Sequence, residues 1–393
     1  MHFYIHSLPP FDPIIIPPPL TLPLLRVSAE LRLPPVLTYS DDVLYNWRLN
    51  STSNPDTLPT PSNLRCNTSF TSTNDEAEFY LVPARMELVG VEALDIMRST
   101  MDELFVSDDI AVRRITEYLY QLVDVIQQLR TVLLDVKRGC DPQVFYHEIR
   151  PWFRGEDSQR GKKWIFDGID QDPALLPPTE LSGPSAGQSS LIHALDIFLG
   201  VDKYSHETDM TGNDAEALEV SQKHKSTFLK RMQLYMPRHH RAFLDHLSNT
   251  PRPLRDFVFS AASASPSTSD LFSLSSKINP SGKGSDGTNG IALLEAYNAT
   301  VMALKELRDA HMIIVALYII GPARHAQHEM SHLSSNNLAT ASNSGPGIDS
   351  DFVRKVGEEV SGESGTLKGT GGTDLVRFLK GVRDQTHGAL MSL

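Results

Sequence analysis

Histidines give this chain two possible metal sites. His311 lies within the apolar stripe of a helix that we predict over residues 291–320. On such a face an imidazole either binds a metal ion or makes a hydrogen bond inside the core, and spacing alone leaves both readings open. The segment HEMSH at residues 328–332 matches the pattern in which two histidines one helical turn apart bind zinc. It follows the helix-ending pair Gly321-Pro322 and has no apolar face to hold it rigid, so we do not interpret it as a zinc site.

Two glycine-rich segments could bring backbone N–H groups close to an anion. Residues 183–190, GPSAGQSS, come directly before a predicted helix over 191–200. Small residues allow close approach and a helix N-terminus favours negative charge, so this segment is either a carboxylate or propionate site or an ordinary capped loop. Residues 368–375, KGTGGTDL, form either a flap that closes over a site or a flexible linker in which Thr373 caps the next helix. Neither segment has the glycine and lysine spacing of a nucleotide-binding loop.

The elements that would hold these segments are helices. Across residues 110–136, leucines and isoleucines recur three and four positions apart, which predicts an apolar stripe facing a core, with Ser107 and Asp108 at its cap. The helix over 291–320 has a similar stripe and should end at Gly321-Pro322. Few segments alternate with the period of two that a half-buried strand needs. We therefore predict a mainly α fold.

Composition along the chain predicts three parts. Residues 1–32 form an irregular lead-in, because their many prolines would break a spanning helix and no basic segment precedes an apolar run, as it would in a signal peptide. Residues 33–106 form a smaller N-terminal domain with a polar insertion at 51–76. Residues 107–393 form a large helical domain with loops at 261–290 and 331–372.

Overall composition excludes several classes of protein. The 393 residues are 40% hydrophobic, enough for a substantial core, and carry a formal net charge of −12 with acidic and basic residues interleaved. Without a basic stripe, nucleic acid is not an expected partner. Cys66 and Cys140 are too few for a disulfide framework or a four-cysteine metal site, which fits a reducing compartment. We expect a cytoplasmic protein that does not span a membrane.

Five separated segments, in this order, resemble indoleamine 2,3-dioxygenases. They are LPPVLTYSDDVLYNW at 33–47, the block over 183–200, YMPRHHR at 235–241, the helix that contains His311, and KGTGGTDL at 368–375. Together they span most of residues 33–393, apart from the polar insertions. The resemblance implies a haem b enzyme in which the large helical domain binds the cofactor and the small domain caps the distal side.

The resemblance gives the proximal side of the haem its expected residues. His311 becomes the expected ligand of the haem iron. Arg308, one turn earlier, would pair with Asp196 and join two walls of the haem site, whereas the plain alternative is an ordinary ion pair between helices. Ser185 and Ala186 would lie beside the haem, with Ser185 close to the propionates or the polar end of the substrate.

On the distal side the family places an aromatic residue and an arginine five positions apart, matched here by Phe145 and Arg150. The ring would pack on the indole, and the guanidinium would bind the amino-acid carboxylate through two hydrogen bonds. Without the resemblance, Arg150 reads as a surface residue. Thr370 in the glycine-rich flap would contact the substrate's polar end or a haem propionate. The rest of the substrate pocket would come from the small domain, through Tyr39, Asp42, Val43, Phe79 and Tyr80.

The implied reaction adds both atoms of O2 across the C2=C3 bond of L-tryptophan to give N-formylkynurenine, the first step of the kynurenine pathway to NAD. We expect a monomer whose only partners are L-tryptophan and O2. Two departures from the family pattern support an alternative, a haem-binding pseudo-enzyme or low-activity paralogue. Pro83 stands where the family has a small polar residue, and the proline-rich lead-in replaces helical chain ahead of residue 33. The carboxylate clamp at Arg150 favours the enzyme, because haem binding alone does not need it.

Overall fold

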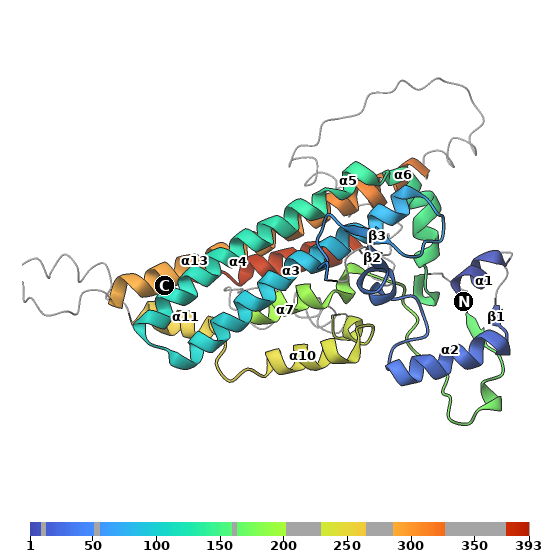
Figure 1. Cartoon of the computed structure of the whole chain (residues 1–393), viewed down its shortest axis with the longest axis horizontal. Coiled ribbons are helices and arrows are strands. Elements are labelled where there is room, and N and C mark those ends of the chain that lie inside the picture. The colour runs from blue at the N-terminus through green and yellow to red at the C-terminus, as the bar shows by residue number, and fades with distance from the viewer. Residues whose placement is uncertain are drawn as a thin grey trace, which may run out of the picture.

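The chain is mainly helical, as predicted. The computed structural model describes residues 1–8, 13–50, 56–158, 163–201, 229–264, 286–326 and 375–392. Its three longest helices run side by side along the length of the molecule (Figure 1): α3 (Asn74–Val106), α4 (Asp109–Leu134) and α13 (Asp286–Val315). Shorter helices pack around these three: α11 (Leu254–Ser263) and α16 (Leu375–Gly388) contact α13, and α7 (Ser190–Phe198) contacts α3. Helix α10 (Arg238–Ser248) packs on α7. None of the helices in the described ranges is long and apolar enough to cross a bilayer.

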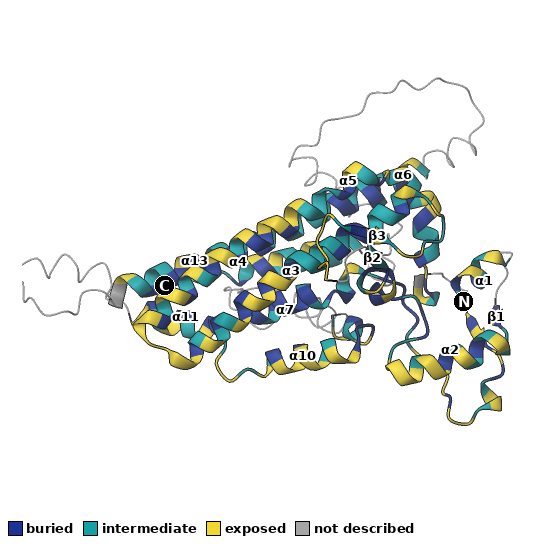
Figure 2. Cartoon of the chain, viewed as in Figure 1, coloured by how far each residue is buried: buried dark blue, intermediate teal, exposed yellow. Residues whose placement is uncertain are grey.

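Helix α4 confirms the predicted apolar stripe. The side chain of Asp108 caps it by accepting a hydrogen bond from the N–H of Ala111 at 2.7 Å. The stripe is fully buried at Ile115, Leu119, Leu122, Ile126 and Leu129. Burial of each of these side chains stabilises the fold by roughly 1.5–3 kcal/mol. Figure 2 shows buried residues where the long helices meet and exposed residues on their outer sides.

Helix α3 begins at the N-cap residue Thr73. The Thr73 hydroxyl accepts a hydrogen bond from the N–H of Glu76 at 3.2 Å, and the Glu76 carboxylate accepts from the N–H groups of Phe70 and Thr71. Farther along α3, Gly90 leaves no room for a side chain, because a Cβ there would collide with the side chain of Leu191 on α7. This contact brings α7, and the loop before it, close to α3.

The helix that carries His311 does not end where we predicted. After α13 the chain makes a π-helical turn, η8 (Ala316–Ile320), and stays helical through residues 321–326. The Gly321 N–H bonds to the Ala316 carbonyl, five residues back, and Gly321 keeps right-handed helical angles. A π turn is a common place for a helix to admit a proline, which has no N–H to donate, so Pro322 continues the helix instead of terminating it.

The N-terminal region is more regular than predicted. It contains α1 (His2–Ser7), β1 (Ile14–Ile16) and α2 (Pro18–Leu31), where we expected an irregular lead-in. Prolines 18 and 19 occupy the first turn of α2, where a helix needs no proline N–H. Strand β1 pairs in parallel with β4 (Trp164–Phe166). Prolines excluded a membrane helix, but they did not exclude local helix and strand.

The polar insertion at 51–76 also contains regular structure. Strand β3 (Leu64–Cys66) pairs antiparallel with β2 (Trp47–Leu49), and α3 starts at Asn74. Of the predicted loop at 261–290, α11 extends to Ser263 and α13 starts at Asp286, whereas the predicted loop at 331–372 lies outside the described residues. Short elements connect the rest: η1 (Ser40–Leu44), α5 (Val136–Gly139), α6 (Pro142–Val144), η2 (Phe145–Ile149), η3 (Arg150–Phe153), η4 (Glu156–Ser158), η5 (Ile169–Gln171) and η6 (Ala186–Gln188).

Candidate functional site

The candidate proximal residue, His311, is held on α13 with its ring half-buried. Burial lowers the pKa of the imidazole to about 4, with the positive charge of Arg308 as the smaller cause. The ring is therefore neutral at physiological pH, and a neutral imidazole has a lone pair available for a metal ion. Within the described ranges, neither ring nitrogen has a hydrogen-bond partner. The role of His311 as a haem ligand stays a prediction.

Arg308 joins three helices beside His311. Its guanidinium forms an ion pair with Asp196 of α7, the contact that we predicted, and both side chains are nearly buried. The same guanidinium donates to the hydroxyl of Thr386 on α16, which is fully buried. We did not predict Thr386, although it lies one turn after Val382 on the apolar face of α16. A polar residue on an apolar face was the available signal.

The loop before α7 is fixed by its own hydrogen bonds. Ser185 caps the short helix η6 by accepting from the N–H of Gly187 at 3.2 Å, and the next residue is Ala186. The ring of the buried His193 bonds to the carbonyl of Gly187 at 2.9 Å. A structured loop of this kind can present backbone N–H groups to an anion.

Two glycines allow this loop to cross the chain after Phe153. A Cβ on Gly183 would collide with the carbonyl oxygen of Phe153, and a Cβ on Gly155 would collide with the carbonyl oxygen of Leu181. Only glycine lets the two backbones approach this closely. The loop over 183–190 is therefore held against the segment that carries Phe145 and Arg150.

An aromatic cluster lies one helical turn along α13 from His311. Phe145 is buried, with its ring centroid 4.4 Å from that of Phe79 and 5.7 Å from that of Tyr318. Ile314, one turn after His311, belongs to the same apolar cluster. Phe145, the predicted indole-packing residue, is therefore in contact with the predicted pocket residue Phe79, in a cluster that includes Ile314 of α13.

A π-helical turn relates Phe145 to Arg150. In η2 the Arg150 N–H bonds to the Phe145 carbonyl, so the two residues are one wide turn apart. Burial lowers the pKa of Arg150, whose guanidinium carbon lies 5.3 Å from the centroid of the Tyr146 ring. The Arg150 side chain is partly buried, and both its expected role and the alternative of a surface residue stay predictions. Desolvation at this position would strengthen a bond to a carboxylate.

The small N-terminal segment adds titratable side chains to this side. Asp42 and Val43 are buried in η1, and burial, with the negative charges of Asp41 and Glu76, raises the pKa of Asp42 well above its usual range. The hydroxyl of the buried Tyr80 donates to Glu76 at 2.8 Å. An aspartate in such surroundings tends to hold a proton.

Tyr39 is bound by two residues that we did not predict. Its hydroxyl donates to Glu87 at 2.9 Å, and its N–H donates to the side chain of Gln188 at 2.8 Å. Glu87 lies three residues after the buried Ala84, so it falls on the inner side of α3. A carboxylate on an inner helix face was a signal that we did not use, whereas nothing in the sequence relates Gln188 to Tyr39.

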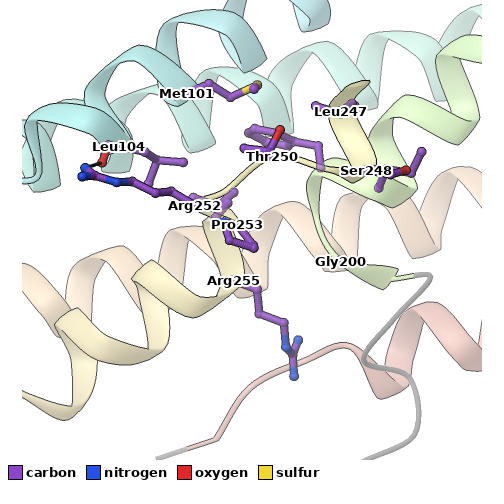
Figure 3. Close-up of a pocket in the computed structure, with 12 residues that line it drawn as sticks. Met101, Leu104, Gly200, Leu247, Ser248, Thr250, Arg252, Pro253 and Arg255 are labelled. Atoms are coloured by element: carbon purple, nitrogen blue, oxygen red, sulfur yellow. Dashed lines mark hydrogen bonds between the residues drawn. The ribbon is translucent and has the colours of Figure 1, made fainter. Parts of the chain in front are cut away.

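The structure does not test two further segments of the sequence analysis. Thr370 and the HEMSH segment lie outside the described residues. In the part of the chain that the structure does describe, no group of three or more His, Cys, Asp or Glu side chains could hold a metal ion. Figure 3 shows a pocket at the C-terminal end of α7, lined by Phe198, Arg252 and Arg255 among others. It is at the other end of α7 from the Ser185 loop.

Comparison with known proteins identifies the family of this chain. A family model for indoleamine 2,3-dioxygenase matches residues 1–389, so the match includes the lead-in that we expected to depart from the family. The chain is 30% identical over 381 residues to the indoleamine 2,3-dioxygenase of Saccharomyces cerevisiae, which covers 95% of this chain and 72% of the yeast protein. It is 31% identical over 386 residues to indoleamine 2,3-dioxygenase 2 of Mus musculus, covering 96% and 73%.

A third relative has a different substrate in its name. The 6-hydroxytryptophan 2,3-dioxygenase of Fusarium equiseti is 26% identical over 377 residues, which cover 96% of this chain and 76% of the fungal protein. Relatives with both kinds of name thus align along nearly the whole chain. The chain belongs to the indoleamine 2,3-dioxygenase family of dioxygenases.

Proposed function

We propose that this protein is a haem b dioxygenase that adds both atoms of O2 across the C2=C3 bond of L-tryptophan and releases N-formylkynurenine. The observation that carries the proposal is the neutral, half-buried His311, one turn after a buried ion pair, in a chain of this family. We further propose that it acts as a cytoplasmic monomer at the start of the kynurenine pathway to NAD.

The residues around His311 fit a haem. The imidazole would ligate the iron from the proximal side, and no described residue competes for its ring nitrogens. Arg308 would lie beside the haem while its pair with Asp196 keeps the two walls together. Ser185 and Ala186 would face the propionates. The haem, when bound, supplies the activation of O2 that protein side chains cannot supply.

The protein's own groups would bind and orient the substrate. Phe145 and Phe79 offer an apolar aromatic surface for the indole ring. Arg150, desolvated and one π turn away, would hold the carboxylate through its two parallel N–H groups. Tyr39, Asp42, Val43 and Tyr80 would close the pocket, and Thr370 would meet the substrate's polar end. Exclusion of water strengthens each of these contacts.

The position of Pro83 limits what the pocket can do. It lies inside α3, four residues after Phe79, and its ring has no donor or acceptor for the indole N–H. Orientation of the substrate would therefore rest on packing and on Arg150. A hydrogen bond of this kind is typically worth about 0.5–1.5 kcal/mol, so its absence would lower substrate affinity without abolishing the reaction.

One observation favours a second candidate substrate, a hydroxylated tryptophan. Asp42 is a buried carboxyl group with a raised pKa, next to Tyr80 in the proposed pocket. Such a group could exchange a hydrogen bond with a ring hydroxyl, which L-tryptophan lacks. The name of the Fusarium equiseti relative makes 6-hydroxytryptophan the substrate to compare.

The test is turnover by the haem-reconstituted full chain under ascorbate and methylene blue, with L-tryptophan and 6-hydroxytryptophan in parallel. We expect N-formylkynurenine from L-tryptophan, followed by its absorbance. Higher kcat/KM for 6-hydroxytryptophan would instead support the second candidate. A haem Soret band that depends on His311, without product from either amino acid, would favour the haem-binding pseudo-enzyme and overturn the proposal.

A further inference from the structure

Glu87 is the one carboxylate of α3 that reaches two other parts of the proposed site. The Tyr39 hydroxyl donates to its Oε1 atom at 2.9 Å, and the Ser189 hydroxyl donates to the same atom at 2.7 Å. Tyr39 precedes η1 in the N-terminal segment, whereas Ser189 ends the loop that contains Ser185. A single oxygen atom therefore joins three stretches of chain that are far apart in sequence.

A second contact fixes the backbone at the same place. The Tyr39 N–H donates to Oε1 of Gln188 at 2.8 Å, and Nε2 of Gln188 donates to the carbonyl of Gly183 at 2.9 Å. Tyr39, Gln188 and Ser189 are all buried. The main chain of Tyr39 is thus bonded directly to the 183–190 loop through Gln188. Its side chain is joined to the same loop through the Glu87 carboxyl group, which also accepts from Ser189.

We propose that Glu87 is a positioning residue for substrate, which holds Tyr39 and the Ser185 loop at a fixed separation through one shared acceptor oxygen. The inference rests on the proposed function, because Tyr39 and Ser185 matter to substrate only if the pocket is where we place it. In this role Glu87 holds Tyr39 and Ser185 in place and requires no movement of either residue. It would set where the pocket wall lies relative to the loop.

The chemistry of the carboxyl group supports this role. Burial raises the pKa of Glu87, and the two hydroxyl donors offset part of that shift. A carboxyl group keeps an oxygen that can accept hydrogen bonds in either protonation state. Glutamine has a carbonyl oxygen at the same position, so it can accept both hydroxyls. Alanine cannot, and it leaves two buried hydroxyl groups without their acceptor.

The experiment compares Glu87→Ala, Glu87→Gln and Asp95→Ala in the haem-reconstituted full chain. Asp95 is a matched control, because it lies on the same helix in an exposed ion pair with Arg98. The probe is L-tryptophan, titrated against the Soret band to give a dissociation constant, with KM and kcat measured in parallel. We expect Glu87→Ala to weaken L-tryptophan binding about tenfold, the equivalent of roughly 1.4 kcal/mol, with haem content unchanged.

The pattern across variants decides the proposal. Glu87→Gln should bind L-tryptophan within about threefold of wild type, and KM should change more than kcat in Glu87→Ala. If Glu87→Ala binds like Asp95→Ala, or if Glu87→Gln is as weak as Glu87→Ala, the proposal is overturned. Wild-type protein that neither binds nor turns over L-tryptophan would instead refute the proposed function.

A second pair of variants covers the case in which Glu87→Ala does not fold. Tyr39→Phe and Ser189→Ala each remove one hydroxyl donor and leave the carboxyl in place. Each should weaken L-tryptophan binding by about threefold or more, because each removes one hydrogen bond to the shared oxygen. If both bind L-tryptophan as wild type does, the shared oxygen does not position the pocket and the proposal is wrong.

Discussion

The two sides of the proposed haem site are built in different ways. On the proximal side, His311, Arg308 and Asp196 come from regular helices, and opposite charges are paired. On the distal side, Phe145 and Asp42 come from single π-helical turns. The proximal side is therefore built from helices joined by an ion pair, whereas the distal side combines π-helical turns with Phe79 and Tyr80 of the long helix α3.

This difference shows what fixes the positions of the residues on each side of the site. A regular helix fixes the spacing of its own residues, so the turn that carries His311 also places Arg308. The π turn at Phe145 is short, and the Phe145 ring packs against Phe79 of α3 and against Tyr318, so its position depends on contacts between separate segments. We therefore expect proximal substitutions to affect haem uptake most, and substitutions of the distal residues that contact substrate to affect substrate binding most.

The largest effect is expected at the proximal histidine. We expect His311→Ala to lose specific haem uptake and all turnover, because α13 contains no other histidine that could ligate the iron. The exposed His325 lies farther along the same helical segment and provides the control, His325→Ala, which should keep both. The measurement is the Soret absorbance per protein after reconstitution. A full Soret band in His311→Ala would show that His311 does not ligate the iron, and the division into proximal and distal sides would fail.

The next effect concerns the proximal ion pair. Asp196→Ala leaves Arg308 nearly buried without its carboxylate, and breaking a buried pair in this way typically costs about 3–5 kcal/mol. Asp95→Ala, which breaks an exposed pair, should cost about 1 kcal/mol or less. Urea unfolding of both variants measures the free energies. Equal losses would show that the proximal wall does not depend on this pair.

A smaller effect, confined to substrate, is expected at Arg150. Arg150→Lys keeps the charge but loses the two parallel donors, so KM for L-tryptophan should rise about tenfold or more while the Soret band stays unchanged. Arg154→Lys, four residues later and exposed, is the matched control. Steady-state kinetics on the two variants make the test. If both raise KM alike, the carboxylate is held elsewhere.

The smallest effect is a pH dependence of stability at Asp42. Burial and the charges of Asp41 and Glu76 raise the pKa of this carboxyl, so its contribution is full below about pH 4 and is lost as the pH rises through the folded-state pKa. Asp42→Asn should therefore be more stable than wild type at neutral pH, by about 1.4 kcal/mol for each unit of pKa shift. The advantage should shrink towards acidic pH.

Urea unfolding between pH 5 and 8 measures this difference. Tyr80 and Cys66 also face Asp42, but both stay protonated in this range because their own pKa values are raised. Wild type should lose stability relative to Asp42→Asn as the pH increases. Parallel profiles for the two proteins would mean that Asp42 has no raised pKa in the folded state.

Helical spacing and the family resemblance predicted different parts of the structure. The stripe of α4 and the pairing of Arg308 with Asp196 follow from helical spacing and from the family resemblance. The helix end at Gly321-Pro322 was wrong because a π turn, which has no spacing signal, admits the proline. Regular helices can be predicted from the local sequence, whereas interruptions such as the π turn cannot.

Long-range contacts set the limit elsewhere. Nothing in the sequence relates Gln188 to Tyr39, because their bond depends on how two distant loops meet. Strand β1 was missed since its partner β4 is 150 residues away and both strands have three residues. Glu87 and Thr386 were within reach, because each is a polar residue on an inner helix face.

Gly155 and Gly183 have a consequence for redesign of this enzyme. Any side chain at either position would collide with a carbonyl oxygen of the opposite segment. Libraries that randomise the turn after Phe153 or the loop before α7 should therefore yield folded members only when both glycines are kept. The two segments form one unit for engineering, and a graft that exchanges one should carry the other with it.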